Sequence, residues 1–179
     1  IVFNDEALRV LRPARRKKSV LRLLDTLDEL QRRDNRGPEQ NEPSGQSRLD
    51  MALTEARRVA HTGSRIFVIS DFLDISEETG TLLGALARHN GVSALRVVDP
   101  LEKELPKSGR FAIAGPDGPV WFDAGNLRFQ MAWHEKVTNH EHRLAECFRT
   151  SGVTMAEVST ANDPAATLKL LLGPGGRIG

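Results

Sequence analysis

Residues 65–74 read RIFVISDFLD, and this stretch decides the fold class. Its IFVI segment is an unbroken apolar run with β-branched residues, which is typical of a parallel strand covered on both faces. Ser70, Asp71 and Asp74 follow at the point where that strand must leave the sheet. Ligands of open α/β sheets bind at the carboxyl ends of the strands. The pattern therefore predicts functional groups at the end of a strand over residues 65–71.

A second apolar run, VSALRVVD over residues 92–99, ends on Asp99 in the same way. Between the two runs, helical apolar spacing and Ser76 as an N-cap predict a helix that closes at Asn90. Apolar periodicity and turn residues predict the remaining elements: helices over 17–33, 48–60, 126–151 and 164–172, hairpins over 1–11 and 111–122, and a strand over 153–158. The chain reads as an α/β layered domain with a mostly parallel sheet.

The helix over residues 126–151 is the longest predicted element. Its apolar spacing assigns six residues to the inward face: Leu127, Met131, His134, Val137, Leu144 and Phe148. Cys147 lies in the same stripe, which favours an inert core thiol over a nucleophile.

The composition indicates one soluble domain. A chain of 179 residues is long enough to bury a core. Its 25 basic and 24 acidic residues nearly cancel and tyrosine is absent, so neither charge nor aromatic content favours a nucleic-acid partner. No run approaches the ~20 apolar residues of a membrane span, so we predict no membrane insertion. The single cysteine fits a reducing compartment, and we expect a cytoplasmic protein.

The domain is predicted over residues 1–172, with a polar loop over 35–46 and a tail over 173–179. The loop sequence, NRGPEQNEPSGQ, interrupts the apolar periodicity with proline and glycine. The chain opens without methionine in what already reads as a strand, so we expect the first strand of the domain to lie upstream of Ile1.

Asp71 and Asp74 are candidate ligands of a hard cation, and Ser47 is a candidate hydroxyl ligand. Mg²⁺ is typically held by one or two carboxylates together with other oxygens and waters. The alternative is structural: Asp74 caps the next helix and Asp71 accepts backbone N–H bonds. Asp99, which precedes Pro100, is predicted to form a turn rather than to bind a metal.

No motif indicates an enzyme. His134, His140 and His142 lie on one predicted helix, but their spacing does not place them together as a zinc site requires. The glycines near the C-terminus follow a helix instead of linking a strand to a helix, so they lack the context of a P-loop.

The order of these motifs resembles the DUF58 family, bacterial proteins with a von Willebrand factor A-like domain that are typically encoded beside MoxR-type AAA+ ATPases. The resemblance rests on FVISDFLD, LRVVDPLEKELP, a small hairpin, a long helix and VSTANDP, and the opening IVFNDEALRVLRPARRKKSVLRLLDTL is also similar. It implies a Rossmann-like, three-layer von Willebrand A-type fold with a mostly parallel sheet and a β-hairpin insertion, whose first strand is absent here.

The resemblance also implies a metal-ion-dependent adhesion site that binds a protein. In such sites a D-x-S-x-S motif, a threonine and an aspartate hold Mg²⁺ or Mn²⁺, and the partner's carboxylate completes the coordination. Asp71 matches the aspartate, and Ser47 stands where the family often has threonine. Three further residues would complete the binding face: Ser70, Asp74 and Asp99. Because Arg48 replaces an acidic position and D-x-S-x-S does not occur, we expect weak or absent metal binding by this chain.

The implied function is protein–protein interaction without catalysis, with a MoxR-type AAA+ ATPase or its client as the partner. One alternative function is that of a metal-dependent phosphohydrolase, because Rossmann-like sheets also place catalytic aspartates at strand ends. That alternative needs a second acidic strand end, such as Asp99, and a phosphate-binding cation, such as Arg110. A third option is a purely structural module that binds no metal, which Arg48 and the missing first strand would fit.

Overall fold

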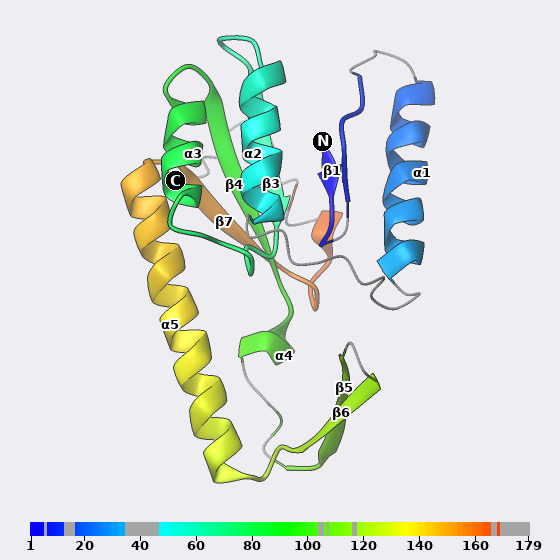
Figure 1. Ribbon diagram of the computed structural model, residues 1–179, viewed down its shortest axis with the longest axis vertical. Coiled ribbons are helices and arrows are strands. Elements are labelled where there is room, and N and C mark those ends of the chain that lie inside the picture. Colours follow the sequence, from blue (N-terminus) through cyan, green and yellow to red (C-terminus); the bar gives the residue numbers. More distant parts are fainter. Residues whose placement is uncertain are drawn as a thin grey trace.

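The structure, a computed structural model, describes residues 1–5, 7–12, 17–34, 47–103, 106, 108–115, 118–165 and 168. Its strands and helices, in chain order (Figure 1), are β1 (Val2–Phe3), β2 (Leu8–Arg9), α1 (Lys17–Asp34), α2 (Arg48–Val59), β3 (Arg65–Ser70), α3 (Thr79–Ala87), β4 (Gly91–Val98), α4 (Pro100–Lys103), β5 (Arg110–Gly115), β6 (Gly118–Asp123), α5 (Leu127–Ser151) and β7 (Thr154–Ser159).

A parallel sheet with the strand order β3-β4-β7 forms the centre of the molecule. Arg65 lies opposite Gly91 in the first strand pair, and Ser93 lies opposite Thr154 in the second. Helices α2, α3 and α5 lie against one face of this sheet (Figure 1). The α/β class, the parallel sheet and the separate hairpin are therefore as the sequence predicts. The three-layer von Willebrand architecture stays a prediction.

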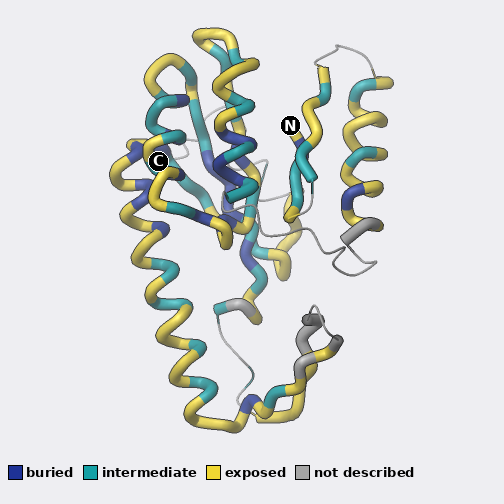
Figure 2. Tube along the Cα trace, viewed as in Figure 1, coloured by how far each residue is buried: buried dark blue, intermediate teal, exposed yellow. Residues whose placement is uncertain are grey.

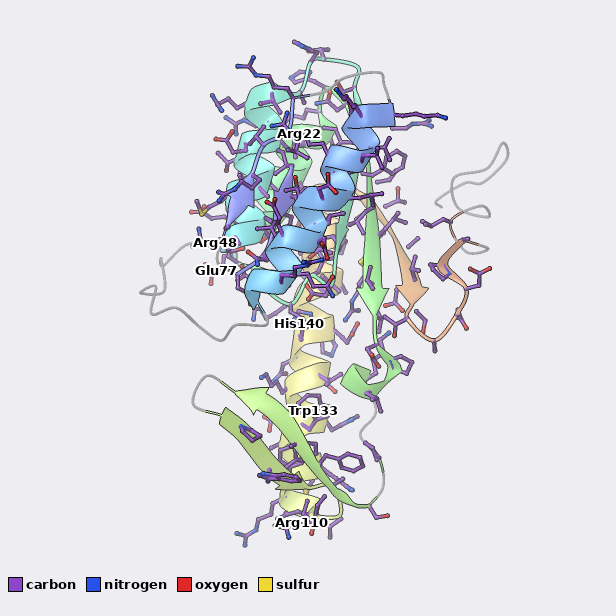
Figure 3. All side chains as sticks on the ribbon, turned by 90° about the vertical axis from the view of Figure 1, so that its right-hand side faces the viewer. Arg22, Arg48, Glu77, Arg110, Trp133 and His140 are labelled. Carbon is purple, nitrogen blue, oxygen red and sulfur yellow. The ribbon has the colours of Figure 1, made fainter. Side chains whose placement is uncertain are left out.

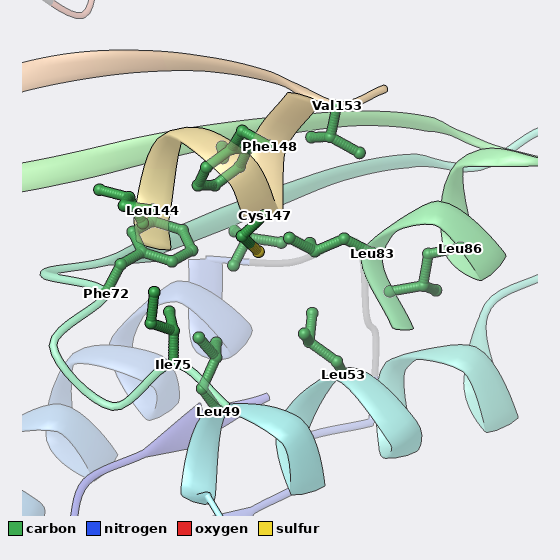
Figure 4. Packing of buried hydrophobic residues seen from close by; sticks show 12 residues of the cluster. Leu49, Leu53, Phe72, Ile75, Leu83, Leu86, Leu144, Cys147, Phe148 and Val153 are labelled. Atoms are coloured by element: carbon green, nitrogen blue, oxygen red, sulfur yellow. The ribbon is translucent and has the colours of Figure 1, made fainter. Parts of the chain in front are cut away.

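The hydrophobic core lies between this sheet and the three helices (Figure 4). It contains Leu49 and Leu53 from α2, Leu83 and Leu86 from α3, and residues from the C-terminal part of α5. Helices α3 and α5 approach closely at Gly80, where a Cβ atom would stand 3.2 Å from the carbonyl oxygen of Cys147. Cys147 is buried, and this burial raises the pKa of its thiol, in agreement with the predicted inert role.

The prediction for the inward face of α5 is wrong over its first half. Leu144 and Phe148 are buried as expected, but Leu127 and Met131 are 73% and 72% exposed. His134 is also exposed. Figure 2 shows that α5 continues beyond the sheet. Among the described residues, the hairpin β5–β6 lies beside its N-terminal part, and α4 contacts α5 as well.

The start of α3 also differs from the prediction. The helix begins at Thr79, with Glu78 as its N-cap, instead of at Ser76. The Ser76 hydroxyl accepts a hydrogen bond from the backbone N–H of Glu78, 2.9 Å away, and forms a turn before the helix. The Ser76 hydroxyl thus stabilises a turn that precedes the helix, instead of capping the helix itself.

The opening hairpin and α1 agree with the prediction in position. β1 and β2 pair antiparallel, and α1 covers the predicted amphipathic stretch. Leu30 of α1 is buried, whereas Val20, Leu24 and Leu27 are exposed. The β5–β6 hairpin is also present, with strands that extend nearer to the turn than predicted. The loop 35–46, the tail 173–179 and most of the predicted helix 164–172 lie outside the described residues.

β3 is an edge strand of the sheet that the described residues form. Phe67 and Ile69 of β3 are exposed, at 40% and 59%. A groove of about 260 Å³, which Ile1 and Phe3 also line, runs beside this edge. The predicted strand upstream of Ile1 stays a prediction. Among the described helices, none has the length and apolar character needed to cross a bilayer.

Candidate functional site

The segment that follows β3, residues 70–76, is called the Asp71 loop below. Its first turn is held by its own side chains: the Ser70 hydroxyl accepts the backbone N–H of Phe72 at 3.0 Å, and Asp71 Oδ1 accepts that of Leu73 at 3.2 Å. The Ser70 hydroxyl also donates to Asp71 Oδ1 at 3.3 Å. Asp71 therefore accepts a backbone N–H, as the structural alternative predicted, while its carboxylate remains exposed.

Phe72 anchors the Asp71 loop in the core. Its side chain is fully buried and meets the Phe148 ring edge to face, with centroids 5.3 Å apart (Figure 4). Its φ of 57° lies in the left-handed region, which a non-glycine residue rarely adopts. Turning Phe72 inward leaves Leu73 outside, where it is 56% exposed between two exposed carboxylates, Asp71 and Asp74.

Ser47 and Asp74 are brought together, and they link the Asp71 loop to α2. The Ser47 hydroxyl accepts the N–H of Asp50 at 3.2 Å as the N-cap of α2, and it donates to the carbonyl oxygen of Asp74 at 2.7 Å. Asp74 Oδ2 accepts the N–H of Arg48 at 2.8 Å. The structural alternative for Asp74 is wrong in detail, because Asp74 caps the preceding helix α2 and not the next one.

Asp50 is a site residue that the sequence reasoning missed. Its carboxylate is 1% exposed and accepts hydrogen bonds from the hydroxyls of Ser76 and Thr79, the latter at 2.7 Å. This network fixes the far end of the Asp71 loop to α2. The available signal was an acidic residue in the first turn of a helix, three positions after a serine, the spacing at which an N-cap and a helical acid interact with the helix start.

Asp99 acts as the predicted turn-former. Its Oδ1 accepts the N–H of Leu101 at 2.9 Å, at the start of α4. Among the described residues, no hydrogen bond joins Asp99 to the Asp71 loop. The second acidic strand end therefore stabilises a local turn.

The described residues do not by themselves fit a divalent cation site. They contain no group of three or more His, Cys, Asp or Glu side chains close enough to hold a metal. The Ser47 hydroxyl is engaged with Asp74 and Asp50, and the Arg48 guanidinium donates to the backbone oxygen of Asp5 at 3.1 Å. Asp71 and Ser47 would leave most of the roughly six oxygen positions around Mg²⁺ to water or to other groups.

The middle of α5 places an ionic network next to this site. The buried Arg96 of β4 makes a bidentate pair with Glu141, at 2.7 and 2.9 Å, and also contacts Glu157 of β7 at 3.1 Å. Lys103 of α4 pairs with Glu157 at 2.9 Å. The hydrogen bond from Arg96 lowers the pKa of Glu141. Because a charged side chain stands within an otherwise apolar strand, Arg96 was visible in the sequence as an exception, but its partners were not.

His140 of α5 lines the same pocket as Arg96 of this network and Leu73 of the Asp71 loop. Burial lowers the pKa of its imidazole, and the positive charge of Arg96 acts in the same direction. The negative charges of Glu141 and Asp71 oppose this shift more weakly. His140 is therefore expected to be neutral at pH 7.

Comparison with protein families identifies the chain. The model of the family described as "Protein of unknown function DUF58" matches residues 1–143. The chain belongs to the DUF58 family. The match includes the whole Asp71 loop and Arg96, and it reaches into α5 as far as Arg143. No curated protein and no solved structure matches the chain.

Proposed function

We propose that this DUF58 chain is a protein-docking module, without catalytic activity of its own, that binds its partner through the Asp71 loop. The supporting observation is one exposed apolar side chain, Leu73, between the exposed carboxylates of Asp71 and Asp74. A central apolar anchor with a polar rim is the common anatomy of a protein–protein interface.

The Asp71 loop is suited to docking because it is held in one conformation before the partner arrives. Phe72 is buried at one end, and Asp50 binds Ser76 at the other. Asp74 is tied to the start of α2 in between. A loop that is already ordered loses little conformational entropy on binding, so more of its contact energy appears as affinity.

The proposed partner is a MoxR-type AAA+ ATPase or a client of that ATPase. The chemistry of the Asp71 loop requires an apolar recess bordered by basic groups on the partner. A metal-dependent adhesion site would need ligands beyond Asp71 and Ser47, so the proposal does not depend on a cation. The phosphohydrolase alternative lacks a specific observation in its favour, since Asp99 is engaged at α4.

The test is binding of the purified protein to a purified MoxR-type AAA+ ATPase, the proposed partner, measured by biolayer interferometry. We expect Leu73→Ala and Asp71→Ala each to weaken binding about tenfold, the loss typical of an interface anchor. Leu101→Ala is the matched control, because Leu101 is 61% exposed on α4 and lies outside the Asp71 loop.

The variants and the EDTA measurement test different parts of the proposal. Equal affinity of all three variants and the unmodified protein would refute docking through this loop. EDTA is expected to leave the affinity unchanged. A loss of binding in EDTA, matched by Asp71→Ala, would instead show that additional ligands complete a cation site.

A further inference from the structure

A pocket of about 660 Å³ lies where α5 passes the Asp71 loop and α4. This volume is typical of sites that bind small molecules. Figure 3 shows Trp133 and His140 on the part of α5 that passes beside α4. The walls consist of residues from four elements of the chain: Leu73, Arg96, Lys103, Ala132, Trp133, Glu135, Lys136, Val137, Asn139, His140, Glu141 and Arg143.

Unpaired buried nitrogens gather at this pocket. Among the described residues, three buried side-chain nitrogens have no hydrogen-bond partner: Arg96 Nε, Trp133 Nε1 and His140 Nε2. All three residues line the pocket, and the Arg96 side chain is only 5% exposed. A buried polar nitrogen without a partner is destabilising, so three such atoms in one place require an explanation. Acceptor atoms of a ligand in the pocket would supply partners for the N–H groups of Arg96 and Trp133 after small side-chain rotations.

The charge of the pocket favours an anion. Its walls carry four cationic side chains and two carboxylates, and Glu157 behind Arg96 adds a third carboxylate. Within the described part of the chain, Lys136 and Arg143 make no ion pair; Arg143 instead donates to the carbonyl oxygen of Ile75 at 2.6 Å. These two cations are available to a negatively charged ligand.

Four apolar residues form another part of the wall. Leu73, Ala132, Trp133 and Val137 line the pocket, and the Trp133 ring stacks on Phe129 with centroids 6.3 Å apart. We infer that this pocket binds a small organic anion, a carboxylate on an aromatic or aliphatic body. The body would pack on Trp133, and the carboxylate would face Arg143 and Lys136. The pocket shares Leu73 with the proposed docking surface, but this inference rests on the walls that α5 contributes, and the variants below change residues of α5. A carboxylate on an apolar body has two possible sources: a free small molecule, or an acidic and apolar segment of a bound protein.

The test uses the fluorescence of Trp133 in the full-length protein. The chain has two tryptophans, so Trp121→Phe, at a side chain that is 64% exposed in β6, makes Trp133 its single indole reporter. Titration with phenylacetate is expected to produce a saturable change in emission. Phenylacetamide, which has the same shape without the charge, is expected to bind at least about fivefold more weakly. Equal responses to the two compounds, or no saturable response to phenylacetate, would overturn the inference.

Variants locate the site. Arg143→Gln and Lys136→Gln are each expected to weaken phenylacetate binding about threefold to tenfold, the loss expected for one charge-assisted contact. Arg128→Gln is the matched control, because Arg128 is exposed on the same helix and does not line the pocket. Circular dichroism establishes that each variant is folded. Equal affinity of all three variants would place the binding elsewhere and overturn the inference.

A competition experiment distinguishes the two sources of the anion. The competitor is a short peptide that contains a Phe-Asp pair with both ends blocked. Tighter binding of the peptide than of phenylacetate assigns the pocket to a segment of a bound protein, whereas tighter binding of phenylacetate assigns it to a free small molecule. Either result supports the inferred chemistry.

Discussion

The two halves of α5 have similar apolar spacing and opposite surroundings. In the C-terminal half, Leu144 and Phe148 are buried against the sheet, at 1% and 8% exposure. In the N-terminal half, Leu127 and Met131 are mostly exposed, at 73% and 72%. Figure 2 shows the change along one continuous helix. The difference teaches that apolar periodicity defines a face of a helix, while burial depends on whether another element lies opposite that face.

Stacked aromatic rings stabilise the N-terminal half of α5 in place of a core. Phe122 of β6 stacks on Phe111 and on Phe129, with centroids 5.8 and 4.7 Å apart, and Phe129 continues to Trp133. This half together with β5–β6 is called the aromatic arm below. A single row of rings buries less apolar surface than a sheet and three helices, so the aromatic arm is expected to open locally before the core unfolds.

The strongest test of the comparison truncates one residue in each half of α5. We expect Leu144→Ala to lower the free energy of unfolding by about 3 kcal/mol, because it leaves a cavity in the core. Met131→Ala is the matched change on the exposed half and is expected to stay within about 0.5 kcal/mol. Urea denaturation measures both. Equal losses would show that the two halves are buried alike.

The Asp50 network extends the core side of the comparison to the Asp71 loop. Asp50→Ala leaves the hydroxyls of Ser76 and Thr79 without their acceptor, and Thr79 is fully buried. We expect a loss of about 2 kcal/mol in the free energy of unfolding. Asp25→Ala on the exposed surface of α1 is the control. A loss no larger than that of the control would mean that the Asp71 loop is held in another way.

Phe122→Ala sharpens the comparison from the other side. Removing the central ring of the aromatic arm breaks two stacked contacts, worth about 0.5–1.5 kcal/mol each. Hydrogen exchange is expected to accelerate in residues 110–133, while the rates in β3 and β4 remain unchanged. Accelerated exchange throughout the sheet would show that the arm and the core unfold together.

His140 stands where the two halves of α5 meet and should give the smallest effect. Its pKa is lowered in the folded protein from the ordinary value of 6.5, chiefly by burial. The unfolded chain therefore binds a proton more readily, and stability falls as the pH drops through 6.5 toward the folded pKa. His140→Asn is expected to flatten this part of a stability-against-pH curve. An unchanged slope between pH 7 and 5.5 would assign the dependence to other groups.

The glutamate that pairs with Arg96 adds a separate acid-induced loss at lower pH. The pKa of Glu141 is lowered from 4.5, so its contribution is complete above that value and is lost as the pH falls through the folded pKa. The two pH ranges keep the His140 measurement distinct.

The sequence predicts those features of the site that depend on neighbouring residues. The apolar run before Asp71 indicated the strand, and Asp99 before Pro100 indicated the turn at α4. The contacts of Asp74 with Arg48 and of Asp50 with Thr79 join segments far apart in the chain, and apolar periodicity carries no signal for them. The left-handed backbone at Phe72 could not be predicted either, because a positive φ is normally expected at glycine and not at phenylalanine.

The burial of α5 was unpredictable for a related reason. The sequence of the helix carries no information about where the sheet beneath it ends, so Leu127 and Leu144 were both predicted to face inward. The pocket beside Trp133 depends on that same change of surroundings along the helix.

The most direct measurement is hydrogen exchange of the protein with and without a purified MoxR-type ATPase, the proposed partner. The docking account predicts slower exchange of the amides in residues 71–75 on binding, with the aromatic arm unchanged. Slower exchange confined to residues 111–131, with the Asp71 loop unaffected, would contradict it and would identify the arm as the binding surface.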